Sequence, residues 1–184
     1  MIVALMVAVL ATVVALLRGG SLDRLAATQL RWLPLLFGAL LVQVALDFSD
    51  PSWLDDAAGL GVLLATNAVV VGFLVLNREL PGMKLAALGL FLNVVVIGAN
   101  GAMPVSESAA ATVGLADELS DPGVKHEVLD SDTRLGFLGD VIPVPGLGKI
   151  ISVGDVVLAA GIGLLAYRRT LEEPQGAREE ATSG

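Results

Sequence analysis

The sequence contains no cysteine, a single histidine, and few aromatic or charged residues. Without cysteine, no disulfide framework, thiolate zinc site or iron–sulfur cluster can form. Only 16% of the 184 residues are charged and 55% are hydrophobic, which is less polar surface than a soluble domain of this length needs. The net charge of −8 argues against nucleic acid as a partner, because phosphate backbones demand clustered Lys and Arg. The composition instead points to a lipid bilayer as the surrounding solvent.

Five apolar runs approach the length needed to cross about 30 Å of hydrocarbon, which is about 20 helical residues. They lie near residues 2–17, 30–47, 57–76, 83–99 and 152–168. The sequence therefore predicts an all-α fold, a polytopic bundle of five transmembrane helices within residues 1–169. A long outer loop is expected at 100–149, and the polar residues 170–184 are expected to form a disordered cytoplasmic tail.

The basic residues in the connecting segments predict how the chain is oriented. Three basic residues fall in the first connection, two in the third and three in the tail, so eight of the 11 lie on one side. These are Arg18, Arg24, Arg31, Arg78, Lys84, Arg168, Arg169 and Arg178. Cytoplasmic loops are enriched in Lys and Arg, so we expect the N-terminus outside and the C-terminus in the cytoplasm. The expected location is the bacterial cell (inner) membrane.

The start of the outer loop, "NGAMPVSES", contains signals that end one helix and begin another. Asn100 and Gly101 suit a helix C-terminus, and Pro104 prevents the helix from continuing. Ser106 is a suitable N-cap for a short helix that would run to about Leu119.

The segment Leu135–Leu147 is apolar apart from Asp140, is too short to span a bilayer, and is broken by glycine and proline. Two arrangements remain open. The segment either re-enters the membrane against the helices, where irregular backbone is tolerated, or rests on their outer ends. The sequence favours the resting loop.

An aspartate, Asp155, lies near the start of the last apolar run, in "SVGD". This string has the form of a capping box, in which Ser152 accepts from the Asp155 N–H and the Asp155 carboxylate accepts from the Ser152 N–H. Capping explains the residue type and its position, and predicts that Asp155→Asn costs little more than about 1 kcal/mol. In the functional alternative, Asp140 and Asp155 converge at the rim of one outer pocket together with Asn100 and Ser152.

The remaining polar residues are more typical of packing or of solvated loops than of a catalytic site. Gln43, Asn67 and Asn93 lie inside predicted spans, where polar side chains tend to hydrogen-bond to other helices. His126 is followed by several acidic residues, but their spacing matches neither an EF-hand loop nor H-E-x-x-H, so no metal site is predicted. No nucleophile-elbow, P-loop, kinase or Rossmann signature is present, and the sequence indicates no cofactor.

Four short strings carry a family resemblance: "RGGSLDRL", "NGAMPVS", "LGDVIPVP" and "SVGDVVL". Over most of Met1–Arg169 the chain resembles a family of small bacterial integral membrane proteins whose function is unknown. The resemblance implies a polytopic membrane protein and supplies no activity. It places the motif positions at Asn100, Gly101, Met103, Pro104, Gly139, Asp140, Pro143, Ser152, Gly154 and Asp155.

Two functional hypotheses follow. The first is a non-enzymatic membrane protein that binds a small molecule or a partner subunit at its extracytoplasmic face. The second is a membrane-embedded enzyme or small transporter acting on a lipid or small solute through Asp140, Asp155 and His126. The expected ligand-binding residues are Asn100, Met103, Pro104, His126, Asp140, Ser152 and Asp155, with Gln43, Asn67 and Asn93 as polar residues within the membrane.

Overall fold

The computed structural model describes residues 2–49, 56–116 and 126–172. The chain is mostly helical, and each of the five apolar runs forms one long helix. These helices are α1 (Ile2–Leu17), α3 (Leu33–Ser49), α4 (Asp56–Leu76), α5 (Met83–Asn100) and α7 (Val153–Leu171). The last helix thus extends to Leu171, into the segment predicted as tail, and residues 173–184 lie outside the described part.

A short helix, α2 (Leu22–Ala26), follows α1 in the connection to α3. Ser21 caps it, since the Ser21 side chain accepts from the backbone N–H of Asp23 at 3.1 Å. The Arg24 guanidinium donates to the backbone oxygen of Leu171 at 2.9 Å, which ties α2 to the end of α7. A helical connector is therefore present.

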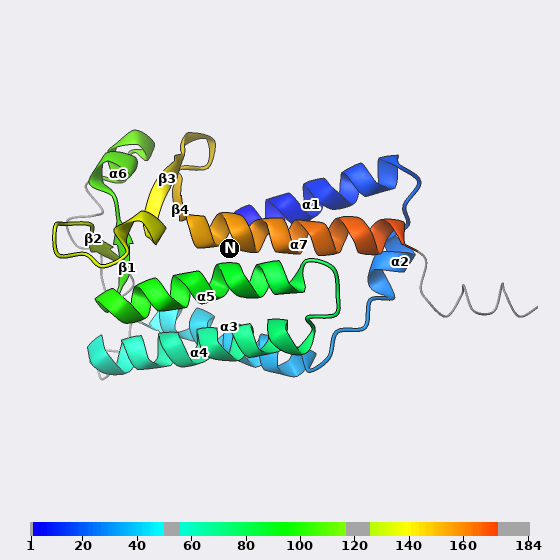
Figure 1. The fold of residues 1–184 in the computed structure, drawn as a ribbon, viewed down its shortest axis with the longest axis horizontal. Helices are drawn as coiled ribbons and strands as arrows, with labels where there is room; N and C mark the ends of the chain where they lie inside the picture. Colours follow the sequence, from blue (N-terminus) through cyan, green and yellow to red (C-terminus); the bar gives the residue numbers. More distant parts are fainter. Residues whose placement is uncertain (1, 50–55, 117–125, 173–184) are drawn as a thin grey trace, which may run out of the picture.

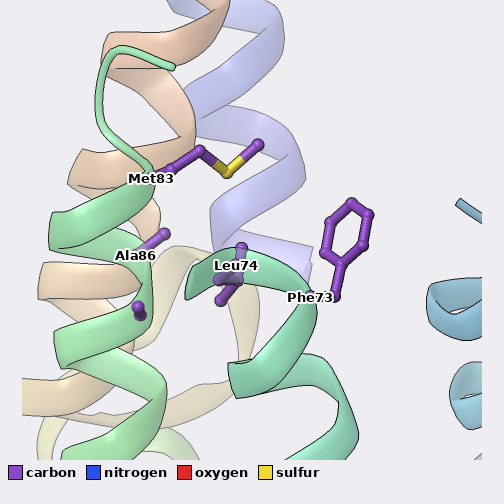
Figure 2. Packing of buried hydrophobic residues seen from close by; sticks show 5 residues of the cluster. Phe73, Leu74, Met83 and Ala86 are labelled. Atoms are coloured by element: carbon purple, nitrogen blue, oxygen red, sulfur yellow. The ribbon is translucent and has the colours of Figure 1, made fainter. Parts of the chain in front are cut away.

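The long helices contact one another mainly in the order α1, α7, α5, α4, α3 (Figure 1). The last helix in the sequence, α7, thus lies between α1 and α5. Figure 2 shows part of the hydrophobic core, in which Phe73 and Leu74 of α4 lie near Met83 and Ala86 of α5. Partly buried aliphatic residues of α3 and α7 pack against this cluster, which thus joins four of the five long helices, α3, α4, α5 and α7.

Small residues allow α5 and α7 to approach closely. A Cβ atom on Gly89 would collide with the backbone of Leu158, and one on Gly161 would collide with the backbone of Ala86. Gly82, which precedes α5 with φ 79°, would likewise collide with the Gly161 carbonyl. Glycine at these positions is therefore required by contact distance, as in helix pairs packed through small residues.

In the part of the chain that the structure describes, two helices are long and apolar enough to cross a membrane, Ala57–Leu76 and Met83–Asn100. The apolar helices Ile2–Leu17 and Leu33–Leu46 are shorter. Length and composition thus suggest membrane association, and the apolar parts of α1 and α3 are shorter than the roughly 17 residues that a span needs.

The prediction of an all-α fold was wrong for the outer loop, which contains a four-stranded sheet in the order β2-β1-β3-β4. The strands are β1 (Met103–Val105), β2 (His126–Val128), β3 (Asp140–Val144) and β4 (Lys149–Ser152). β1 pairs in parallel with β2 and β3, whereas β3 and β4 are antiparallel. Strands of three to five residues are too short to show a clear period-2 pattern, and their partners are distant in sequence.

The apolar segment Leu135–Leu147, expected to be a loop, forms β3 and two 3₁₀ turns, η2 (Gly136–Leu138) and η3 (Pro145–Leu147). The backbone of β3 pairs with β4 over most of its length and with β1 at Asp140. Helix α6 (Glu107–Val113) follows β1 in the chain. Its N-cap is the predicted residue Ser106, whose side chain accepts a hydrogen bond from the Ala109 N–H. It ends at Gly114 rather than near Leu119.

Candidate functional site at the junction of the sheet and the helices

The predicted capping box at the start of α7 is confirmed. Ser152 is the last residue of β4 and the N-cap of α7. Its side-chain oxygen accepts from the Asp155 N–H at 2.9 Å, and its backbone N–H donates to Asp155 Oδ2 at 3.3 Å. The two residues therefore satisfy backbone donors at the first turn of α7, as expected for this motif.

Asn93 of α5 joins the capping box from the neighbouring helix. Asn93 Nδ2 donates to Asp155 Oδ1 at 2.9 Å, and Ser152 Oγ donates to Asn93 Oδ1 at 2.9 Å. Asn93 and Ser152 are both buried. A Cβ atom on Gly154 would overlap the Asn93 side-chain oxygen, so glycine at this position leaves room for the bond. The three polar side chains form one network that ties α5 to α7 and β4.

Asp140 lies beside this network, at the start of β3. Its Cα is paired with that of Ser152 on β4 and with that of Val105 on β1, and its backbone oxygen accepts from the Ser106 N–H at 3.0 Å. Burial, together with the negative charge of Asp155, raises the pKa of the Asp140 carboxyl to about 7. The Asp140 side chain can therefore gain or lose a proton near neutral pH.

A small cavity of about 80 Å³ lies on another side of Asp155. The first residues of α1, the strand β4 and the first turns of α7 line it: Ile2, Val3, Ala4, Lys149, Ile150, Ile151, Asp155 and Leu158. Asp155 and Lys149 are the two residues with charged side chains among those that line it. Asp140 is not among the lining residues. The two carboxylates interact electrostatically, but they do not line this cavity together, as the functional alternative required.

The other predicted site residues lie in separate places. Asn100 contacts the loop before η2, since it accepts from the Arg134 N–H and donates to the Arg134 carbonyl, both at 2.8 Å. Met103 and Pro104 are buried in β1. His126 opens β2, where its Cα is paired with that of Met103, and its side chain lies outside the description. No group of three or more potential metal-ligating residues occurs within the described ranges.

Two of the three polar residues in predicted spans hydrogen-bond to another helix. Gln43 of α3 donates to the Thr66 hydroxyl of α4 at 3.1 Å, and Asn93 bonds to α7 as described above. Asn67 donates to the Leu63 carbonyl of its own helix at 2.8 Å. Lys149 was not expected at the site. The sequence carried no signal for it, because its place in the cavity depends on the pairing of β4 with β3.

The model of one protein family matches residues 27–167, which run from the connection after α2 almost to the end of α7. The chain belongs to this family, described as Family of unknown function (DUF5317). The family resemblance read from the sequence is thereby confirmed. The matched residues include the network of Asn93, Ser152 and Asp155, and Asp140 beside it.

The chain is also similar to an uncharacterised protein of Thermotoga maritima, with 35% identity over 94 residues. The similar region covers 49% of this chain and 53% of the relative, so the chain spans about half the length of the curated relative it matches. No solved structure matches the chain. The family membership therefore supplies no activity, which has to be argued from the site.

Proposed function

We propose that this protein spans the bacterial cell (inner) membrane five times, through α1, α3, α4, α5 and α7, with its N-terminus outside and its C-terminus in the cytoplasm. Two helices that meet the length and hydropathy criteria for a span support this topology, as do the two shorter apolar helices. The 16 residues of α1 extend about 24 Å at 1.5 Å per residue. Local thinning of the bilayer accommodates that length at modest cost.

The distribution of charge along the fold supports the proposed orientation. The basic residues of the first and third connections and of the end of α7 lie at one end of the helices, and the sheet and α6 lie at the other (Figure 1). Alkaline phosphatase fusions test the orientation. Fusions after Arg78 and at the C-terminus should be inactive, and one after Gly114 should be active. Activity of either of the first two would contradict the topology.

We further propose that the outer end of the protein binds a small polar molecule, or a polar group of a partner subunit, without transforming it. The cavity between β4, α1 and α7 carries this proposal, because two residues of opposite charge, Asp155 and Lys149, stand among the residues that line it. A volume of about 80 Å³ accepts a polar end group rather than a whole drug-sized ligand, whose sites are about 300 Å³ or larger. Specificity would come from the two charged groups.

One observation favours the second candidate, an enzyme or transporter acting on a lipid or small solute. The Asp140 carboxyl has a pKa of about 7, which suits a group that exchanges a proton at neutral pH. In this second candidate function, the Asp140 carboxyl transfers the proton, and Asp155 and His126 assist the transfer.

Complementation of a strain that has a deletion phenotype distinguishes the candidates. Ala4→Leu fills the cavity, and Ala160→Leu makes the same change on the exposed face of α7 as a matched control. Binding in the cavity predicts that Ala4→Leu fails to complement at normal protein levels, while Ala160→Leu and Asp140→Asn complement. Proton-transfer chemistry predicts that Asp140→Asn fails, with His126→Ala and Asp155→Asn impaired as well. Full complementation by Ala4→Leu would refute the cavity proposal.

A further inference from the structure

Two asparagines at opposite ends of α5 make the same backbone contacts. Asn77, in the turn before α5, accepts from the Arg31 N–H at 2.8 Å and donates to the Arg31 carbonyl at 3.0 Å. Asn100, the last residue of α5, makes both of these bonds to Arg134, each at 2.8 Å. Each asparagine also donates to the carbonyl four residues before it. Each thus clamps the backbone of one arginine to the end of a helix.

The residue after each clamped arginine has a left-handed backbone. Trp32 has φ 60° and Leu135 has φ 55°, and they are the two non-glycine residues with positive φ within residues 2–49, 56–116 and 126–172. Residues other than glycine, asparagine and aspartate rarely adopt this conformation, and when they do the surrounding structure must hold it. The asparagine clamps are the contacts that hold these two turns.

Both turns present large apolar side chains to the surroundings. Trp32 is 61% exposed at one end of the fold. Leu135 is 40% exposed and Phe137, in η2, is 68% exposed at the other. The arginines that precede them, Arg31 and Arg134, are exposed as well. Each end therefore combines an exposed guanidinium with an adjacent exposed apolar group at a backbone position that is fixed.

The length of α5 is close to the thickness of the hydrocarbon core of a bilayer. One turn is bonded to the α4–α5 connection and the other to the last residue of α5, whose 18 residues extend about 27 Å at 1.5 Å per residue. The hydrocarbon core of a bilayer is about 30 Å thick, and aromatic and basic side chains concentrate just outside it. A helix of this length places one turn at each boundary between hydrocarbon and headgroups.

We propose that Arg31-Trp32 and Arg134-Leu135, with Phe137, are paired binding sites for glycerophospholipids in the two leaflets. At each site the guanidinium contacts lipid phosphate and the apolar side chains enter the region of the upper acyl chains. The asparagine clamps hold both sites at a fixed separation, and the pair sets the depth of the protein in the membrane. This proposal rests on the proposed membrane topology and is independent of the ligand cavity.

Depth-dependent fluorescence quenching tests the proposal in vesicles of phosphatidylcholine and phosphatidylglycerol that carry bromine at different acyl positions. Trp53→Phe leaves Trp32 as the reporter of the first site. Phe137→Trp, in a background of Trp32→Phe and Trp53→Phe, reports the second. Phe91→Trp in that same background is the control, because Phe91 is 52% exposed near the middle of α5. Both site reporters should be quenched most by bromine nearest the headgroups, and the Phe91→Trp reporter by the deepest bromine.

The outcomes separate this proposal from the topology on which it rests. Deep quenching of the Phe91→Trp reporter without quenching at either site would overturn the lipid sites and leave the spanning topology intact. Absence of quenching at all three positions would overturn the topology itself. Asn77→Ala should change the quenching profile of Trp32 alone, and Asn100→Ala that of the Phe137→Trp reporter alone, with helix content verified by circular dichroism. Unchanged profiles in both folded variants would refute the role of the clamps.

Discussion

Replacing Asp140 with asparagine should stabilise the protein at pH 8 and leave its stability at pH 4 nearly unchanged. In the folded chain burial, assisted by the charge of Asp155, raises the pKa of this carboxyl from 3.8 to about 7. Between these two values the folded state keeps a proton that the unfolded state has lost. The folded state thus binds more protons in that window, and the free energy of unfolding falls as pH rises through it.

The size of the effect follows from the difference between the two pKa values. A difference of about 3, at about 1.4 kcal/mol for each pKa unit, amounts to about 4 kcal/mol. The residue is only 9% exposed, so solvent screens its carboxyl weakly. An asparagine has nearly the same shape and no charge, and the backbone pairing of residue 140 is unaffected. The stability of the variant minus that of the native chain should therefore grow from near zero at pH 4 to about 4 kcal/mol at pH 8.

The measurement is unfolding by SDS in mild-detergent micelles, followed by circular dichroism at several pH values. Asp130→Asn is the matched control, since backbone N–H groups, Asp132 first, and the Thr133 hydroxyl lower the pKa of the exposed Asp130 carboxyl. Its ionised form is the stabilised one, so this substitution should weaken the protein above about pH 4, in the opposite direction. A stability difference for Asp140→Asn that stays flat from pH 4 to 8 would refute the argument from burial.

Three further predictions concern the network around the capping box, each measured as the free energy of unfolding. Asn93→Ala should cost about 3 kcal/mol, because the buried Ser152 hydroxyl and the Asp155 carboxylate each lose a hydrogen-bond partner. Its control, Asn67→Ala, removes a bond within one helix and should cost under about 1 kcal/mol. Gly154→Ala should destabilise the protein by about 2 kcal/mol or more, because the added methyl group overlaps Asn93. Gly72→Ala, which has open space around it, should instead stabilise by about 0.5 to 1 kcal/mol, and equal effects of the two changes would contradict the packing argument. Asp155→Asn should cost about 2 kcal/mol rather than the roughly 1 kcal/mol expected from capping alone, because both carboxylate oxygens accept hydrogen bonds and an amide offers one acceptor. A cost below about 1 kcal/mol would mean that the bond from Asn93 contributes little.

The helices and the capping box could be predicted from the sequence because their signals are local. Each apolar run is continuous, and Ser152 and Asp155 are three residues apart, so the pattern that identifies the motif also forms it. The N-cap Ser106 is a similar case, since the bond it accepts comes from three residues further along. Such features need no knowledge of the rest of the fold.

The sheet and the network could not be predicted, because they depend on residues far apart in the chain. Strand β1 pairs with β3 across 35 positions, from Val105 to Asp140, and neither strand is long enough to reveal itself. Asn93 meets Ser152 59 residues later, and a polar residue within an apolar run does not say which helix it faces. The raised pKa of Asp140 has the same origin, since burial and proximity to Asp155 both follow from strand pairing.

The position of α7 between α1 and α5 has a consequence for biosynthesis. While the ribosome is still making the first 150 residues, α1 lacks its principal neighbour, and α4 is the main helix against which α5 can pack. The half-made protein is therefore one lone helix followed by a three-helix unit, α3 to α5. The final helix joins the two parts when it forms, and only then can Asn93 bond to Ser152 and Asp155. A chain that stalls or is cut before α7 therefore leaves the two parts unjoined.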